Sequence, residues 1–164
     1  MNGEFEAWAA EAGYEVFREP DSIVIASVNG GEIRYEVTVA GEVVTVTRAE
    51  RAEDPAPQLR STDVLDAERY LTAQLGIDLR SRRELPRLSF PYEPEDAAPG
   101  FHFEKLDGGW ATLLRSSGEI IPAALKDTSM NPVVRFSYYV DASTEEIRRS
   151  FADPSGAPLF TFVV

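Results

Sequence analysis

The chain carries one pattern of residues twice, from Gly13 and again from Gly100, and this duplication limits what it can fold into more than any other feature. The first copy reads GYEVFREPDSIVIASVNGGEIRYEV and the second reads GFHFEKLDGGWATLLRSSGEIIPAA. Few residues are identical, but no gap is needed and apolar positions match, so that Ile23 falls on Trp110. Apolar residues that alternate with polar ones, between turns rich in glycine, are typical of antiparallel strands. The sequence therefore predicts a duplicated, strand-rich scaffold that presents surfaces for binding.

The first copy is predicted to form an antiparallel meander of four strands. We expect these strands at 14–18, 22–28, 32–39 and 42–48. Asn29-Gly30 is a strong signal for a two-residue hairpin turn between the second strand and the third. The stretch that follows, 50–58, is charged and contains prolines, and it is interpreted as a loop.

The second copy is predicted to repeat this meander. We expect its strands at 101–106, 110–115, 119–125 and 133–140. A polar loop, KDTSMNP at 126–132, stands where the first copy has only the short turn Ala40-Gly41. A last strand is expected at 159–164.

Three helices accompany these strands. The first, 4–12, ends at Gly13, and the second, 64–75, is capped by Thr62 or Asp63 and ends at Gly76. Ser143 and Glu146 form a capping box for the third, which reaches about Phe151.

The predicted fold class is therefore α+β, with an N-terminal helix and two pseudo-repeated four-stranded antiparallel meanders, each followed by a helix. The prediction is one domain, 1–164, with halves at about 13–76 and 100–152 and a proline-rich connector at 77–99. Whether the halves share one sheet is left open.

Composition narrows the classes of partner and the compartment. With 16 basic and 28 acidic residues the formal net charge is −12 at pH 7, which argues against nucleic acid because phosphate binding needs a positive face. The chain has no cysteine, an acidic N-terminus without the basic start and apolar stretch of a signal peptide, and no apolar run of the length a membrane span needs. We therefore expect a cytoplasmic protein, with no nucleic-acid or membrane partner and a monomer favoured.

The sequence shows little catalytic equipment. His102 is the only histidine, and it alternates with phenylalanines on a predicted strand, so it is interpreted as structural or incidental. Gly30-Gly31 and Gly108-Gly109 precede strands and not helices, so they are hairpin glycines and not phosphate loops. We predict no catalytic residue, no cofactor and no metal, although a calcium or magnesium site made only of carboxylates is left open.

Contact residues are predicted by elimination. Most aromatic residues, Trp110 included, fall at periodic positions and are assigned to the core, whereas Tyr92 and Met130 are candidates for exposed contact. The hypothesis places the contact surface on the second copy's wide polar loop and on neighbouring hairpin turns, because this loop is where the two copies differ. Met130 packing back over a sheet edge is an equal alternative. The predicted partner-binding residues are Asp107, Ser116, Ser117, Lys126, Asp127, Met130 and Asn131.

Several short phrases between Asp63 and Leu159 occur together in a known family. They are ERYL at 68–71, DLRSR at 78–82, LPRL at 85–88, AAPGF at 97–101, YVDAS at 139–143 and FADPSGAPLF at 151–160. In combination they resemble the immunity proteins of bacterial polymorphic toxins, the family that includes the immunity factor for tuberculosis necrotizing toxin. The first meander matches this family less clearly.

The resemblance implies an antitoxin that binds a cognate toxin domain and blocks it. In the named example the toxin destroys NAD by glycohydrolysis, so the resemblance also implies an NAD glycohydrolase as the target. The matching residues are caps, turns and core positions, and the resemblance therefore transfers no binding residue. The runner-up function is a cytoplasmic secretion or folding chaperone that holds a client segment, and a small enzyme is the third. A toxin domain encoded beside this chain would favour immunity over the chaperone.

Overall fold

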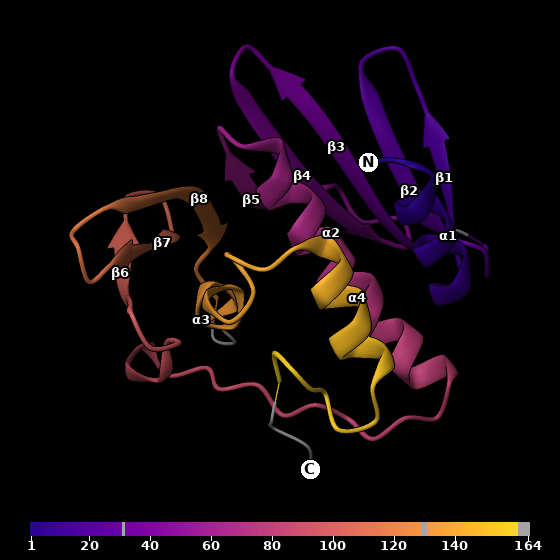
Figure 1. The fold of residues 1–164 in the computed structure, drawn as a ribbon. Helices are drawn as coiled ribbons and strands as arrows, with labels where there is room; N and C mark the ends of the chain where they lie inside the picture. Colours follow the sequence, from indigo (N-terminus) through magenta and orange to yellow (C-terminus); the bar gives the residue numbers. More distant parts are fainter. Residues whose placement is uncertain (31, 129–130, 161–164) are drawn as a thin grey trace.

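The computed structural model describes residues 1–30, 32–128 and 131–160. Its eight strands are β1 (Tyr14–Arg18), β2 (Ser22–Ser27), β3 (Ile33–Ala40), β4 (Val43–Glu50), β5 (Ala56–Ser61), β6 (Phe101–Leu106), β7 (Trp110–Arg115) and β8 (Ile120–Lys126). They form one antiparallel sheet in the order β1-β2-β3-β4-β5-β8-β7-β6 (Figure 1). The two copies therefore share a single sheet, which is joined where β5 pairs with β8.

The helices are α1 (Gly3–Ala12), α2 (Val64–Arg82), α3 (Pro132–Ser137) and α4 (Thr144–Ala152), with a short 3-10 turn, η1 (Pro94–Asp96). Figure 1 shows α2 and α4 side by side in front of the sheet, and the connector running from the end of α2 to η1 and β6. The α+β class, the N-terminal helix and the antiparallel pairing of the strands are confirmed. Their distribution differs from the prediction, because five strands precede α2 and three follow it.

The core lies between the sheet and α2. Inward-facing strand residues such as Ile25, Val46, Leu59 and Leu125 are fully buried, and they alternate with outward-facing neighbours as the pleat requires. Residues on nearly all sides of α2 are buried as well, because the sheet covers one side while α1 and α4 cover others. The helix is therefore central to the fold, with polar residues such as Asp66 and Arg80 among its buried side chains.

The predicted strand at 133–140 is wrong, because its first residues form α3. Pro132 stands in the first turn, where its fixed φ favours a helix and its missing N–H is not needed. Val133, Val134 and Phe136 are then buried together. Branched residues had suggested a strand, but the core buries them at helical spacing.

The stretch assigned to a loop contains β5, which the sequence analysis missed. Pro57 pairs with Thr47 next to a register shift in β4, and a proline is tolerated at such an irregularity because the ladder there needs no N–H. Leu59 supplies the buried side chain. The strand expected at 159–164 is wrong at 159–160, which form no strand, and 161–164 lie outside the described residues.

The second helix does not end at Gly76 but continues to Arg82. Gly76 is there because α4 packs closely against it. A Cβ at this position would lie 2.4 Å from Cγ of Phe151. The glycine thus permits a close approach of two helices and is not a stop, and the predicted border between the first half and the connector falls inside α2.

Helix caps were predictable from local chemistry. Asp63 accepts a hydrogen bond from the N–H of Leu65 at the start of α2, and Ser143 with Glu146 forms the capping box of α4. At the end of α1, Gly13 adopts φ +88°, which a residue with a Cβ rarely reaches. These three predictions are confirmed.

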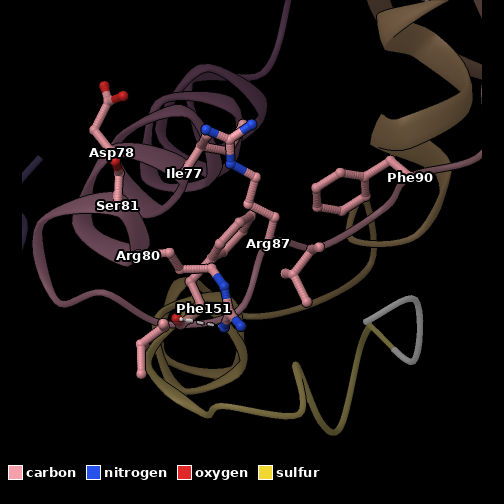
Figure 2. Close-up of a pocket in the computed structure, with 9 residues that line it drawn as sticks. Ile77, Asp78, Arg80, Ser81, Arg87, Phe90 and Phe151 are labelled. Carbon is pink, nitrogen blue, oxygen red and sulfur yellow. Dashed lines mark hydrogen bonds between the residues drawn. The ribbon is translucent and has the colours of Figure 1, made fainter. Parts of the chain in front are cut away.

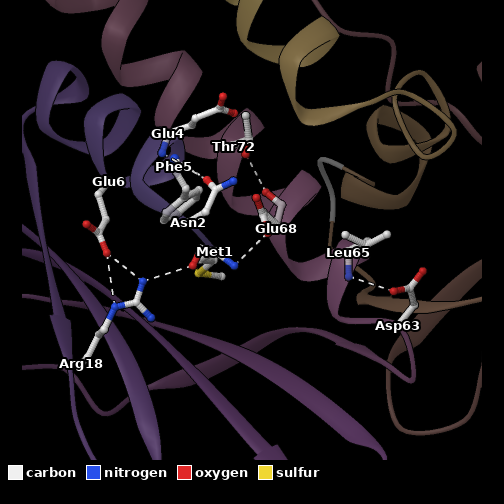
Figure 3. Close-up of polar contacts among 10 residues, drawn as sticks. All are labelled: Met1, Asn2, Glu4, Phe5, Glu6, Arg18, Asp63, Leu65, Glu68 and Thr72. Carbon is white, nitrogen blue, oxygen red and sulfur yellow. Dashed lines mark hydrogen bonds and ion pairs between the residues drawn. The ribbon is translucent and has the colours of Figure 1, made fainter.

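Figure 3 shows how the first residues are fixed to the rest of the fold. The Asn2 side chain caps α1 by accepting from the N–H groups of Glu4 and Phe5. The amino group of Met1 lies 3.0 Å from the Glu68 carboxylate on α2. Among the residues that the structure describes, no helix combines the length and the hydrophobicity needed to cross a bilayer.

Candidate partner-binding site

Predicted contact residues meet at one end of the sheet, where β6 and β8 end and β7 begins; we call it the loop end. Lys126 donates from Nζ to the Gly108 carbonyl at 2.8 Å, in the turn Asp107–Gly109. The backbone N–H of Asp127 donates to the same turn at 2.9 Å. The Asp127 carboxylate lies 3.2 Å from Nζ of Lys105. Asp107, Lys126 and Asp127 are therefore held together as one surface.

Ser116 and Ser117 lie elsewhere. They form the turn between β7 and β8 and are exposed. Strand β7 carries the chain away from the loop end over six residues, which is about 20 Å at the usual rise per residue. The prediction that this turn neighbours the wide loop is wrong, because consecutive turns of a meander lie at opposite ends of its strands.

The remainder of the wide loop is only partly described. Asn131 donates from its side-chain amide to the Tyr92 carbonyl, which ties the loop to the connector. Tyr92 itself is 49% exposed, so its assignment as an exposed residue is confirmed. Met130 lies outside the described residues.

Sequence analysis missed the position of Trp110, which it assigned to the core. Trp110 pairs with Lys126 across β7 and β8 and is only partly buried. It lies on the face of the sheet opposite to the helices, since the adjacent Ala111 is fully buried on the inner face. The Arg60 guanidinium lies 4.4 Å from its ring centroid, and Nζ of Lys126 lies 5.2 Å from it. The sequence signal for this exposed position is the glycine turn Gly108-Gly109, which directly precedes Trp110.

A second feature opens on the inner face of the sheet near the loop end. It is a cleft of about 300 Å³ between β3, β4, α2 and the start of α3; we call it the Arg–Tyr cleft. Its lining residues are Ile33, Tyr35, Arg48, Gln58, Tyr70, Gln74, Ile77, Asp78, Thr128, Pro132 and Arg135. Thr128 and Pro132 belong to the wide loop, so two of its described residues form part of the rim of the cleft.

Polar groups of the cleft differ in how well they are paired. Arg48 lies 3.0 Å from the Glu50 carboxylate, and Asp78 accepts a 2.7 Å hydrogen bond from the Tyr14 hydroxyl. The Nε atom of Arg135, in contrast, is buried and has no hydrogen-bond partner among the described residues. Tyr70 is 4% exposed, and within the described part of the chain no residue bonds to its hydroxyl.

Both tyrosines of the cleft stay protonated at neutral pH. Burial raises the pKa of Tyr35 to about 12, against the opposing charge of Arg48. Burial also raises the pKa of Tyr70 far above its ordinary value, although Arg48 and Arg135 act in the opposite direction. Their hydroxyl groups therefore remain available as hydrogen-bond donors.

A pocket of about 290 Å³ lies further along α2, against the connector, and it shares Ile77 and Asp78 with the Arg–Tyr cleft (Figure 2). Arg80 forms much of its wall and is 3% exposed. Its guanidinium donates to the carbonyls of Pro86, Phe151, Asp153 and Pro154. These bonds tie α2 to the connector and to the turn after α4, so this polar cluster holds the fold together.

No arrangement typical of a reaction centre is seen in the described residues. His102 is exposed on β6. Within the ranges that the structure describes, no group of three or more His, Cys, Asp or Glu side chains is placed to hold a metal ion. The described residues instead form two features: half-buried Trp110 close to the cations Arg60 and Lys126, and the polar Arg–Tyr cleft.

The chain belongs to the immunity protein 61 family, whose model matches residues 8–159. The match includes both copies of the duplicated pattern. The family resemblance inferred from the sequence is confirmed.

Individual relatives agree with this assignment. The chain is 30% identical over 135 residues to the immunity factor for TNT of Mycobacterium tuberculosis (strain ATCC 25618 / H37Rv), which covers 80% of this chain and 74% of the relative. The immunity factor for TNT homolog of Mycobacterium bovis (strain BCG / Pasteur 1173P2) gives the same values. A solved structure of Rv3902c from M. tuberculosis has a TM-score of 0.83 at 25% identity, and the match covers 99% of this chain and 94% of that one.

Proposed function

We propose that this protein is an antitoxin, which binds a cognate bacterial toxin domain and blocks it without making or breaking a covalent bond. The family match over residues 8–159 carries the proposal. A net charge of −12 supports it further, because an acidic protein attracts a basic partner and speeds their association.

The finer part of the proposal is that the toxin is an NAD glycohydrolase. Two relatives are named as an immunity factor for TNT and its homolog. The resemblance described above implies the same target. Blocking such an enzyme needs only steric obstruction of its cleft, and a rigid scaffold lowers the entropic cost of tight binding.

We further propose that the loop end is the contact surface, with Asp107, Trp110, Lys126 and Asp127 as its centre. Tryptophan and arginine are enriched where interfaces gain most of their binding energy. Trp110 is half-buried, and Arg60 and Lys126 hold its ring in place. A fixed aromatic side chain loses little rotamer freedom on binding, so it suits the centre of an interface.

The test is direct inhibition. The purified chain is added to the toxin domain encoded beside its gene, and NAD consumption is measured against the molar ratio of the two proteins. We expect loss of activity near one to one, and survival of cells that express both proteins. Undiminished NAD consumption with a stable complex would disprove the blocking role. Binding only to an unfolded segment of the secreted protein would favour the chaperone.

The change Asp127→Ala tests the contact surface itself. It removes the ion pair with Lys105 and a carboxylate at the loop end, so toxin affinity is expected to fall while the melting temperature stays close to that of the wild type. Calorimetric titration and thermal unfolding measure the two quantities. Equal toxin affinity of the wild type and the Asp127→Ala variant would show that Asp127 is not part of the contact surface.

A further inference from the structure

The Arg–Tyr cleft holds hydrogen-bond donors that the fold itself does not use. Arg135 is a cation with no ion-pair partner among the described residues, and its buried Nε–H also lacks an acceptor. The Tyr70 hydroxyl faces the same space and is equally without a partner in the described chain. Buried donors are almost always paired in folded proteins, so the unpaired Nε–H of Arg135, beside a second unused donor in the same cleft, indicates a missing acceptor.

The surroundings of Arg135 keep its donors aimed at the cleft. Its guanidinium lies 4.4 Å from the Phe90 ring centroid, so the connector covers one face of the planar group. Pro132, in the first turn of α3, fixes the short helix that carries Arg135. A planar cation held in this way presents its N–H groups in one direction, which suits a carboxylate.

The other charged groups of the cleft are already engaged. Asp78 accepts from the Tyr14 hydroxyl, and Glu50 pairs with Arg48. The cleft lining thus holds two cations, Arg48 and Arg135, and one carboxylate, Asp78, so positive charge and donors are in excess there. A ligand that brings an acceptor with negative charge fits this arrangement, and an amine does not.

We propose that the Arg–Tyr cleft receives a carboxylate side chain of the bound toxin, with Arg135 as its charge partner and Tyr70 as a second donor. This inference rests on the proposed function. The rim of the cleft includes Thr128 and Pro132. Both residues belong to the wide loop, which begins at the loop end. A partner seated on the loop end therefore reaches the cleft with one acidic residue.

The size of the cleft favours a side chain over a separate ligand. Its volume of about 300 Å³ is at the lower limit for pockets that bind small molecules, which span about 300–1,000 Å³. A free dicarboxylate remains the other source of the same chemistry, and the experiment below distinguishes the two.

The test measures the affinity of the neighbouring toxin domain for four variants by calorimetric titration. Tyr70→Phe removes the hydroxyl donor, and Arg135→Gln removes the positive charge together with the Nε–H. Both changes keep most of the side-chain volume. Tyr138→Phe is the matched tyrosine control, because its hydroxyl donates to the Asp96 carbonyl outside the cleft. Arg18→Gln is the arginine control, since Arg18 lies on the edge strand β1 and pairs with Glu6 of α1, outside the cleft. A parallel titration uses glutarate as a free dicarboxylate.

Each cleft variant is expected to bind the toxin about 10- to 100-fold more weakly, the effect of losing one hydrogen bond to a charged group. Both controls should stay within about two-fold of the wild type. One Asp or Glu of the toxin, changed to its amide, should cause a similar loss that is not additive with Arg135→Gln.

Three results would overturn the inference. Tight toxin binding by both cleft variants would reject the carboxylate site while leaving the antitoxin function intact. Saturable glutarate binding that Arg135→Gln abolishes, with toxin affinity unchanged, would assign the cleft to a free metabolite. Failure of the wild type to bind the toxin would reject the proposed function, and this inference with it.

Discussion

Two arginines in neighbouring clusters along α2 use the same chemical group in different ways. Arg80 is buried and all of its bonds go to backbone carbonyls of the connector and of the turn after α4. Arg135 is stacked on Phe90, and its Nε has no partner within the described chain. A fully paired polar cluster stabilises a fold, whereas a cluster with donors left over is prepared for something outside it. Burial of a charge therefore does not by itself mark a functional site.

The largest expected effect on stability comes from Arg80, whose guanidinium nitrogens all donate hydrogen bonds. Arg80→Met leaves several buried carbonyls without a donor, and it should lower the free energy of unfolding by about 3–5 kcal/mol. Urea unfolding measures this change. Arg82→Met, which alters an exposed arginine one half-turn further along α2, is the control and should change stability by less than about 0.5 kcal/mol. Equal stability of the two variants would mean that the Arg80 cluster does not hold the fold together.

The packing of α2 against α4 gives the next largest effect. Gly76→Ala places a methyl group 2.4 Å from Cγ of Phe151, and it should cost about 1–3 kcal/mol through overpacking. Gly3→Ala in α1 meets no atom within 4 Å and should be neutral or stabilising by up to about 1 kcal/mol. Thermal unfolding of both variants decides the point, and a gain in stability from Gly76→Ala would contradict the close approach.

Changes to the unpaired donors of the Arg–Tyr cleft should have little effect on stability. Tyr70→Phe removes a hydroxyl that no described residue bonds, so stability should change by less than about 1 kcal/mol. Chemical denaturation checks this value on the same variant whose toxin affinity is measured. A loss of stability as large as that of Arg80→Met would show that the Tyr70 hydroxyl is structural. The contrast between the Arg80 cluster and the Arg–Tyr cleft would then disappear.

The smallest expected effect on stability concerns an exposed ion pair that belongs neither to the Arg80 cluster nor to the Arg–Tyr cleft. Arg115 donates two hydrogen bonds to Asp141, and these lower the pKa of the Asp141 carboxyl below its ordinary value of 3.8. A lowered pKa in the folded state means that the pair stabilises the protein above about pH 3.8 and that this contribution is lost as pH falls through the folded-state pKa.

Asp141→Asn should therefore be slightly less stable than the wild type at neutral pH, and the difference should vanish in strong acid. Denaturant unfolding at a series of pH values measures it. A difference that grows as pH falls would contradict the assigned direction of the pKa change.

Local chemistry made much of the fold predictable. The caps at Asp63 and Ser143 and the stop at Gly13 depend on a few neighbouring residues, and these predictions are confirmed. Strands β2 and β3 are antiparallel as expected, but their register, with Ala26 opposite Arg34, does not fit the predicted two-residue turn at Asn29-Gly30. Errors arose where tertiary contacts decided the outcome. Gly76 has the sequence signature of a helix end, but its role depends on Phe151, which is distant in the chain.

The candidate site was harder to predict than the fold. The wide loop at 126–132 was found because the two copies differ there, and its contact with the Asp107 turn follows from strand direction. The positions of Trp110 and of the Arg–Tyr cleft follow from how β5 joins the two copies, and the sequence analysis had not predicted that strand. Pairing of Arg60 with β8 is what brings its guanidinium to Trp110.

Toxin affinity at the two ends of the second meander tests the central claim most directly. The comparison is between Trp110→Ala at the loop end and the double change of Ser116 and Ser117 to alanine at the opposite end. We predict that Trp110→Ala weakens binding by about 30-fold or more, as expected for a residue at the centre of an interface, and that the serine variant binds like the wild type. Loss of binding by the serine variant alone, with Trp110→Ala unaffected, would contradict the account.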